Sequence, residues 1–156
     1  MTQSPQSLHI IIGMPGSGKT TYLKKLLADG VIDRYFDDYQ KGAPQDESNP
    51  RRKSDPRLSP NYADLKAALR AGQNVAIADI RYCVPEEQQI IEDFAAAEFP
   101  EVTRVLTFFA NSPEACRHNV RLRNREGHVE KELQNIDKIT AQYNPPQNQV
   151  LPVIMG

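Results

Sequence analysis

An eight-residue glycine-rich segment carries the clearest chemistry in this chain. It reads Gly13-Met14-Pro15-Gly16-Ser17-Gly18-Lys19-Thr20 and matches the pattern G-x-x-x-x-G-K-[ST]. Phosphate groups need converging N–H donors, a backbone free to adopt positive φ and no obstructing side chains, and the three glycines meet the last two needs. Lys19 can reach the β and γ phosphates, and Thr20 can offer its hydroxyl to Mg²⁺. We therefore predict that this segment, together with Thr21, binds ATP with Mg²⁺.

The flanking sequence supplies the context that such a loop requires. The apolar run Leu8–Ile12 predicts a strand covered on both faces. After the loop, Lys19–Ala28 has the apolar spacing of an amphipathic helix, whose N-terminus would add oriented dipoles. The alternative is an ordinary glycine turn, which would not need a buried strand before it and a helix after it.

Acidic residues follow two further predicted strands. Asp37 and Asp38 come directly after Arg34–Phe36, and Asp79 comes directly after Val75–Ala78, with Arg81 two residues later. Ligands gather beyond the carboxyl ends of parallel strands, so these side chains are predicted to lie near the phosphate loop. The alternative is that the aspartates only stabilise turns or cap a helix.

A basic segment stands late in the chain and holds Arg117, Arg121, Arg123 and Arg125. On one continuous helix, the first, second and fourth of these arginines would share a stripe at i, i+4 and i+8. Like charges in a stripe repel one another unless an anion lies between them, so the stripe suggests a phosphate ligand. The alternative is a solvated basic face that pairs with Glu126, Glu130 and Glu132.

Composition limits the function classes. The 156 residues fit one domain, and a formal net charge of −1 argues against general affinity for nucleic acid or anionic lipid. Cys83 and Cys116 lack metal-ligand spacing and are interpreted as free thiols. No apolar run approaches the roughly 18 residues of a membrane helix, and no signal peptide is recognised, so we expect a cytoplasmic protein without membrane contact.

The remaining pattern alternates strands with helices, which predicts an α/β fold with a parallel sheet covered on both faces. Residues 1–7 are predicted to be flexible, and residues 41–60 to form a mobile loop whose basic triplet, Arg51-Arg52-Lys53, could steer an anionic acceptor or simply be solvated. The other predicted helices are Asn61–Ala71, one that begins at Pro85, one that begins at Ser112 and ends before Gly127, and His128–Tyr143. The other predicted strands are Val102–Phe109 and Val150–Ile154.

The chain resembles the small P-loop kinases, in the branch that includes polynucleotide kinases and zeta-toxin-like kinases. The resemblance rests on the phosphate loop, on Phe36-Asp37-Asp38-Tyr39, on the strand that ends at Asp79 and on the arginine-rich helix. The D-x-x-G and N-K-x-D patterns of GTPases and the L-S-G-G-Q pattern of transporter ATPases do not occur. The resemblance implies a single three-layer α/β/α domain over residues 1–156, a five-stranded parallel sheet of order 2-3-1-4-5 and a lid at residues 112–128.

The resemblance also implies roles on the acceptor side. Asp37 matches the aspartate that accepts the proton of the acceptor hydroxyl, and Asp38 is its neighbour or reserve. Asp79 would hold a magnesium-bound water or orient the acceptor, and Arg81 would pair with Asp79 or bind substrate. The relatives place an arginine shortly after the paired aspartates, where this chain has Gln40.

On the nucleotide side, the four arginines of the basic segment would close over the transferring phosphoryl group. Arg121 and Arg125 are the predicted catalytic pair, and Arg117 and Arg123 the predicted nucleotide-binding pair. The relatives often carry an arginine where this chain has Asn119.

Three functions remain open from the sequence. The first is an ATP-dependent kinase for a hydroxyl group of a small metabolite, nucleoside or nucleotide. The second is a kinase for the 5′-hydroxyl end of a nucleic acid, which Asp37-Asp38-Tyr39 favours and Gln40 weakens. The third is an ATP-binding module or slow ATPase that phosphorylates nothing. The sequence identifies neither the acceptor nor the oligomeric state.

Overall fold

Five parallel strands form one sheet in the order β2-β3-β1-β4-β5, as predicted. The computed structural model describes residues 5–42, 55–147 and 149–155. The strands are β1 (Ser7–Ile12), β2 (Arg34–Phe36), β3 (Val75–Ala78), β4 (Thr103–Phe109) and β5 (Val150–Leu151).

The helices separate the strands in the chain and cover the sheet. They are α1 (Lys19–Ala28), α2 (Tyr62–Arg70), α3 (Pro85–Glu98), α4 (Pro113–Arg123) and α5 (Val129–Thr140), with short 3-10 helices η1 (Pro56–Leu58) and η2 (Ile80–Cys83). None of the helices in the described part of the chain has the length and hydropathy that crossing a bilayer requires.

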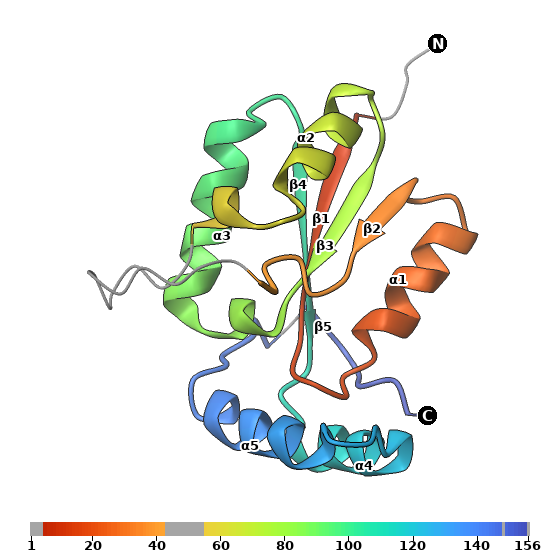
Figure 1. The fold of residues 1–156 in the computed structure, drawn as a ribbon, viewed down its shortest axis with the longest axis vertical. Coiled ribbons are helices and arrows are strands. Elements are labelled where there is room, and N and C mark those ends of the chain that lie inside the picture. The colour runs from red at the N-terminus through yellow and green to blue at the C-terminus, as the bar shows by residue number, and fades with distance from the viewer. Residues whose placement is uncertain (1–4, 43–54, 148, 156) are drawn as a thin grey trace.

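The sheet divides the core into two layers. Leu8, Ile10 and Ile12 of β1 pack with apolar side chains of α2, α3, α4 and α5. Ile11 points to the opposite face, where it packs with Leu23 and other side chains of α1. This alternation along one strand confirms the three-layer α/β/α arrangement, with α3 and α1 on opposite sides of the sheet in Figure 1.

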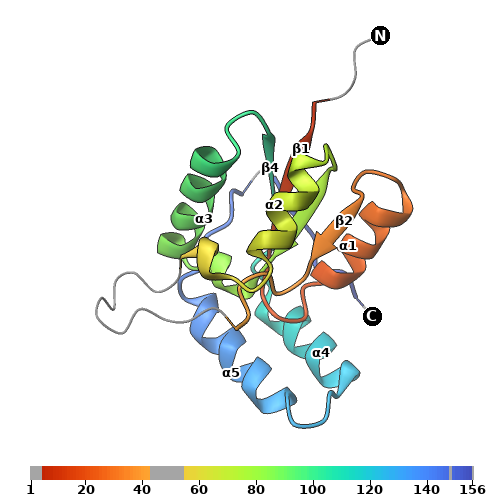
Figure 2. The ribbon, with the colours of Figure 1, turned by 45° about the horizontal axis from the view of Figure 1, so that its top comes forward.

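The carboxyl ends of the strands meet at one edge of the sheet. Figure 1 shows β1 leading at this edge into the turn before α1, with α4 and α5 below it. The two helices pack against each other and remain side by side in the second view (Figure 2). Residues that follow the strands are therefore gathered at the edge of the sheet that faces this helical pair, where ligands bind in open parallel sheets.

Several predicted boundaries differ from the structure. Residues 1–4 and 43–54, which include the basic triplet, lie outside the described residues. Gln6 belongs to the segment predicted to be flexible, but its side-chain amide donates to the carbonyls of Leu69 and Gln73, each at 2.7 Å. At the end of the predicted mobile loop, the Asp55 carboxylate accepts from the Arg57 N–H at 3.0 Å and caps η1, so residues 55–60 are structured.

The last strand is shorter than the predicted Val150–Ile154. After Leu151, whose carbonyl accepts from the Ala110 N–H at 2.8 Å, the chain leaves β4. The Ile154 N–H donates instead to the Ser17 carbonyl at 3.0 Å. The segment after β5 therefore crosses to the phosphate loop instead of extending the sheet.

Both cysteines are free thiols, as predicted, and both are buried. Burial raises the pKa of the Cys83 thiol to about 12 and that of Cys116 to about 11. At pH 8 the fraction of the thiol present as reactive thiolate is therefore on the order of one in ten thousand for Cys83 and one in a thousand for Cys116.

We expect the folded protein to react slowly with a disulfide reagent such as DTNB, and both thiols to react rapidly in guanidinium. Fast stoichiometric labelling of the folded protein would contradict this burial.

Candidate active site

The phosphate loop between β1 and α1 is packed so closely at two of its glycines that neither position has room for a side chain. Gly16 and Gly18 have φ of +81° and +102°. A Cβ atom on Gly16 would lie 2.4 Å from the Cys116 carbonyl oxygen of α4, and one on Gly18 would lie 2.6 Å from the Cβ of Ile154. Glycine is required at both positions by conformation and by space, so main-chain N–H groups can converge on a phosphate.

Lys19 is buried at the start of α1 and reaches back over the loop. Its ammonium donates to the carbonyls of Gly13 at 2.6 Å and Met14 at 2.9 Å. Burial lowers the pKa of this ammonium, and the carboxylates of Asp37 and Asp38 oppose that shift. The lysine ammonium thus lies against the main chain of the phosphate loop.

Asp37 lies beside the predicted magnesium ligand. The Thr20 hydroxyl donates to Oδ2 of Asp37, and the Asp38 N–H donates to Oδ1 at 3.1 Å. A threonine hydroxyl can donate its proton to a carboxylate while its oxygen ligates a cation, so this pair suits Mg²⁺ with water ligands. In the part of the chain that the structure describes, no group of three or more His, Cys, Asp or Glu residues could hold a metal, and Mg²⁺ bound through phosphates does not need one.

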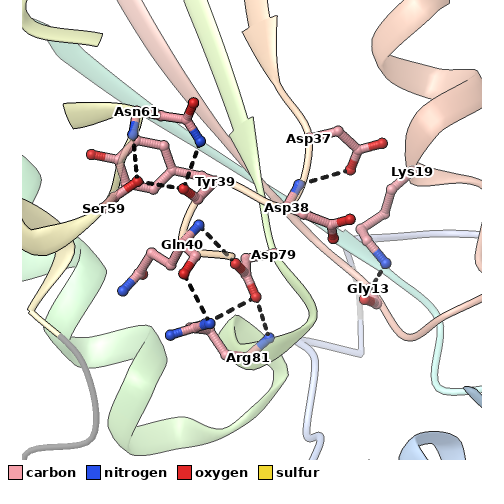
Figure 3. A network of polar contacts seen from close by, with 10 residues as sticks. All are labelled: Gly13, Lys19, Asp37, Asp38, Tyr39, Gln40, Ser59, Asn61, Asp79 and Arg81. Atoms are coloured by element: carbon pink, nitrogen blue, oxygen red, sulfur yellow. Dashed lines mark hydrogen bonds and ion pairs between the residues drawn. The ribbon is translucent and has the colours of Figure 1, made fainter. Parts of the chain in front are cut away.

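Asp38 adopts a backbone conformation that is uncommon for a residue with a side chain. Its φ is +51°, and hydrogen bonds on either side hold it there, from the Tyr39 N–H to the Ala78 carbonyl and from the Lys41 N–H to the Asp38 carbonyl, each at 2.9 Å. Figure 3 shows its carboxyl turned toward Lys19, whereas that of Asp37 points elsewhere. Such strain at a ligand site commonly serves to aim a side chain.

The Asp38 carboxyl accepts no hydrogen bond from the described residues, unlike that of Asp37. Partial desolvation raises its pKa above the ordinary value, the nearby carboxylates of Asp37 and Asp79 raise it further, and Lys19 opposes the shift. Asp38 therefore presents a carboxyl that is free to meet a ligand.

Asp79 is buried and fully engaged by the protein. Its Oδ2 accepts from the Gln40 N–H at 2.9 Å, and its Oδ1 accepts from both the N–H and Nε of Arg81 at 3.1 Å. These bonds tie the end of β3 to the turn after β2 (Figure 3). The predicted metal pair of Thr20 and Asp79 is not joined by any contact between described residues, and the carboxylate that Thr20 contacts is that of Asp37.

The arginine stripe predicted for the lid does not form. Helix α4 ends at Arg123, and Asn124 turns the chain with φ of +44°, so Arg125 lies beyond the helix. Arg117 pairs with Asp137 at 2.7 Å. It and Arg121 are not among the pocket-lining residues. The prediction of the stripe was wrong because it assumed a helix that continues to Arg125, two residues beyond the end of α4.

Arg123 and Arg125 do line the pocket, where both face Glu132 at 3.1 and 3.9 Å. Pairing of the basic segment with a glutamate of α5, the alternative weighed from the sequence, is therefore present for these two arginines. His128 and Lys131 line the same side and were not predicted.

Asn119 is another residue that the sequence did not assign to the site. Its buried side-chain amide donates to the carbonyls of Gly16 and Ile154, each at 2.8 Å. The bonds join α4, the phosphate loop and the segment after β5. The only indication of this role in the sequence was that Asn119 stands where the relatives often carry an arginine. No sequence pattern indicated that Ile154 would contact the loop.

These groups surround one pocket of about 710 Å³, a size typical of small-molecule sites. Its lining residues include twelve of the predicted site residues, namely Pro15, Gly16, Gly18, Lys19, Thr20, Thr21, Asp37, Asp38, Asp79, Arg81, Arg123 and Arg125. Gly13, Met14 and Ser17 belong to the loop but do not line the pocket.

A family model described as an AAA domain, AAA_33, matches residues 8–146. The chain belongs to the AAA_33 family. The match spans the phosphate loop, both acidic strand ends and α4, and it confirms the predicted membership of the P-loop kinases. Among curated proteins, none matches this AAA_33 domain.

Solved structures share the fold of this AAA_33 domain. A gluconokinase from Sinorhizobium meliloti 1021 is similar with a TM-score of 0.58 and 13% identity, over 99% of this chain and 86% of that one. A putative kinase from Chloroflexus aurantiacus is similar with a TM-score of 0.55 and 14% identity, over 96% of this chain and 88% of that one. A chain of the Pnkp1/Rnl/Hen1 RNA repair complex is similar with a TM-score of 0.54 and 16% identity, over 99% of this chain and 50% of that one.

Two glycines with the same backbone conformation test the tight packing of the loop. Gly16 and Gly72 both have φ of +81°, but a Cβ on Gly72 would meet nothing within 4 Å. We expect Gly72→Ala to lose about 1–2 kcal/mol of unfolding free energy, from the backbone alone, and to keep Mg·ATP binding. Gly16→Ala should lose more stability and its ATP binding, as measured by urea unfolding and calorimetry. Equal behaviour of the two variants would show that the contact with Cys116 does not constrain the loop.

Proposed function

We propose that this protein transfers the γ-phosphoryl group of Mg·ATP to a hydroxyl group of a small acceptor. The observation that carries the proposal is a free carboxyl, that of Asp38, beside Lys19 at the mouth of the phosphate loop. A carboxyl at the place of transfer can accept the proton of an acceptor hydroxyl and aim its oxygen at the γ-phosphorus. Membership of AAA_33 and the kinase folds to which the chain is similar support the same class.

The transfer requires few covalent events. The O–H bond of the acceptor breaks and its proton passes to a carboxylate, the acceptor oxygen forms a bond to the γ-phosphorus, and the bond from that phosphorus to the β-bridging oxygen breaks to release ADP. Mg²⁺, held through Thr20 beside Asp37, would supply neutralisation of the β and γ oxygens when bound. Lys19 and the cations Arg123 and Arg125 would contribute stabilisation of the charge that develops on the phosphoryl oxygens.

The two neighbouring aspartates divide the work in this proposal. The sequence predicted Asp37 as the base, but both oxygens of Asp37 already accept hydrogen bonds, one of them from the Thr20 hydroxyl. We therefore assign Asp37 to orienting Thr20 and the water ligands of magnesium, and Asp38 to receiving the acceptor proton.

A 5′-hydroxyl end of a nucleic acid is the second candidate acceptor. It is favoured by the order Asp37-Asp38-Tyr39 and by the fold shared with a chain of an RNA repair complex. Tyr39, however, is fully buried and donates its hydroxyl to the Pro56 carbonyl at 3.1 Å, so it serves the core and not an acceptor. The small acceptor remains the main proposal.

The function is tested with γ-labelled ATP and three acceptor groups: sugar acids and polyols, nucleosides, and 5′-hydroxyl oligonucleotides. We expect labelled product with a member of the first two groups. Lys19→Ala should lower the transfer rate by about 10²–10³-fold, whereas Lys24→Ala, on an exposed position of the same helix, should leave it unchanged. Product with oligonucleotides alone would select the second candidate, and phosphate release without any acceptor would identify an ATPase.

The division between the aspartates is tested by two matched variants. Asp38→Asn should fold well, because asparagine tolerates positive φ, and should lower kcat by about 10²–10⁴-fold at an unchanged Mg²⁺ requirement. Asp37→Asn should instead raise the Mg²⁺ concentration needed for half-maximal ATP binding, as measured by calorimetry. If Asp38→Asn keeps its kcat and Asp37→Asn loses it at saturating Mg²⁺, the base is Asp37.

A further inference from the structure

We propose that Arg81 forms a subsite for an anionic group, a carboxylate or a phosphate, carried by the phosphoryl acceptor. The inference rests on the proposed function, because it places the anion on the same molecule that presents its hydroxyl to Asp38. It narrows the acceptor class from any alcohol to a hydroxylated acid or a phosphorylated alcohol.

One edge of the Arg81 guanidinium is fixed by the protein. Nε donates to Oδ1 of Asp79 at 3.1 Å, and Nη2 donates to the Gln40 carbonyl at 3.2 Å. Both partners are buried, and Asp79 is itself held by two main-chain N–H groups. The guanidinium therefore has its orientation set before any ligand arrives, which lowers the entropy cost of binding.

The other edge of the guanidinium is free to bind. Of the five N–H donors of an arginine, those on Nη1 and the second on Nη2 have no partner among residues 5–42, 55–147 and 149–155. The side chain is 29% exposed and lines the 710 Å³ pocket. Two parallel N–H donors in a fixed plane match the two oxygens of a carboxylate or phosphate.

The position of Arg81 suits an acceptor that extends away from the nucleotide. In Figure 3, Asp38 lies between Lys19 on one side and the pair of Asp79 and Arg81 on the other. A hydroxyl at Asp38 would leave the rest of the acceptor to run toward Arg81. Lys41 lines the same wall and adds a second cation near Asp38.

The charges of the pocket permit an anion at this end. Three carboxylates, those of Asp37, Asp38 and Asp79, are matched by the cations of Lys19, Lys41 and Arg81, all lining the same pocket. Asp79 supports the guanidinium from the protein side, as a buried carboxylate commonly does for an arginine that binds an anion.

The test measures binding separately from catalysis. The protein is saturated with Mg²⁺ and a non-hydrolysable ATP analogue, which occupies the phosphate loop, and is then titrated in a calorimeter with two matched pairs of probes. The first pair is D-gluconate and its neutral counterpart D-sorbitol, and the second is adenosine 3′-monophosphate and adenosine. The pairs distinguish a carboxylate from a phosphate.

We expect the charged member of one pair to bind at least tenfold more tightly than its neutral counterpart. Arg81→Lys should abolish that difference, because one ammonium can still pair with Asp79 but cannot also offer two parallel donors. Arg57→Lys is the matched control, since Arg57 is also paired with carboxylates, Asp55 and Glu98, but lies outside the pocket lining. Thermal unfolding of both variants checks that they fold.

The outcomes separate this inference from the proposed function. Equal or absent binding of charged and neutral probes by the wild-type protein overturns the subsite, as does a preference that survives in Arg81→Lys. A charge preference that depends on Arg81, in a protein that transfers no phosphoryl group, supports the subsite and contradicts the kinase. Phosphoryl transfer to neutral acceptors with no charge preference supports the kinase and contradicts the subsite.

Discussion

The contact between the main chain of the phosphate loop and the elements that enclose it is the constraint on which the site depends. The loop has α4 against Gly16 and the segment after β5 against Gly18, and neither position has room for a methyl group. With no side chain at these two glycines, the main-chain N–H groups of the loop are left to bind phosphate, and the Lys19 side chain reaches back over the loop. The glycines are therefore required by packing as much as by chemistry.

Much of the fold was predictable from the sequence because local patterns and topology agree. The apolar run of β1, the glycine-rich turn and the helix α1 follow one another without interruption, and the acidic residues stand directly after β2 and β3. In a parallel sheet this order is sufficient to bring them to one edge. The pocket accordingly contains the lysine, the threonines and all three aspartates that the sequence singled out.

The features that the sequence did not predict depend on where a helix ends and on which residues pair with each charged or polar side chain. The arginine stripe failed because α4 ends at Arg123, and a left-handed residue at Asn124 is not visible in helical spacing. The hydrogen bond from the Gln40 N–H to Asp79 was not predictable either, because it depends on the distance between segments far apart in the chain. Nothing in the composition of the last residues indicated that Ile154 would lie against Gly18.

The amide of Asn119 has a consequence for how the domain behaves as a whole. By joining Gly16 to Ile154 it connects the phosphate loop to the residues that follow the two-residue edge strand β5. An edge of that length has little stability of its own. We therefore expect nucleotide bound at the loop to stabilise this edge of the sheet, and by reciprocity a ligand that orders the edge should increase the affinity for the nucleotide.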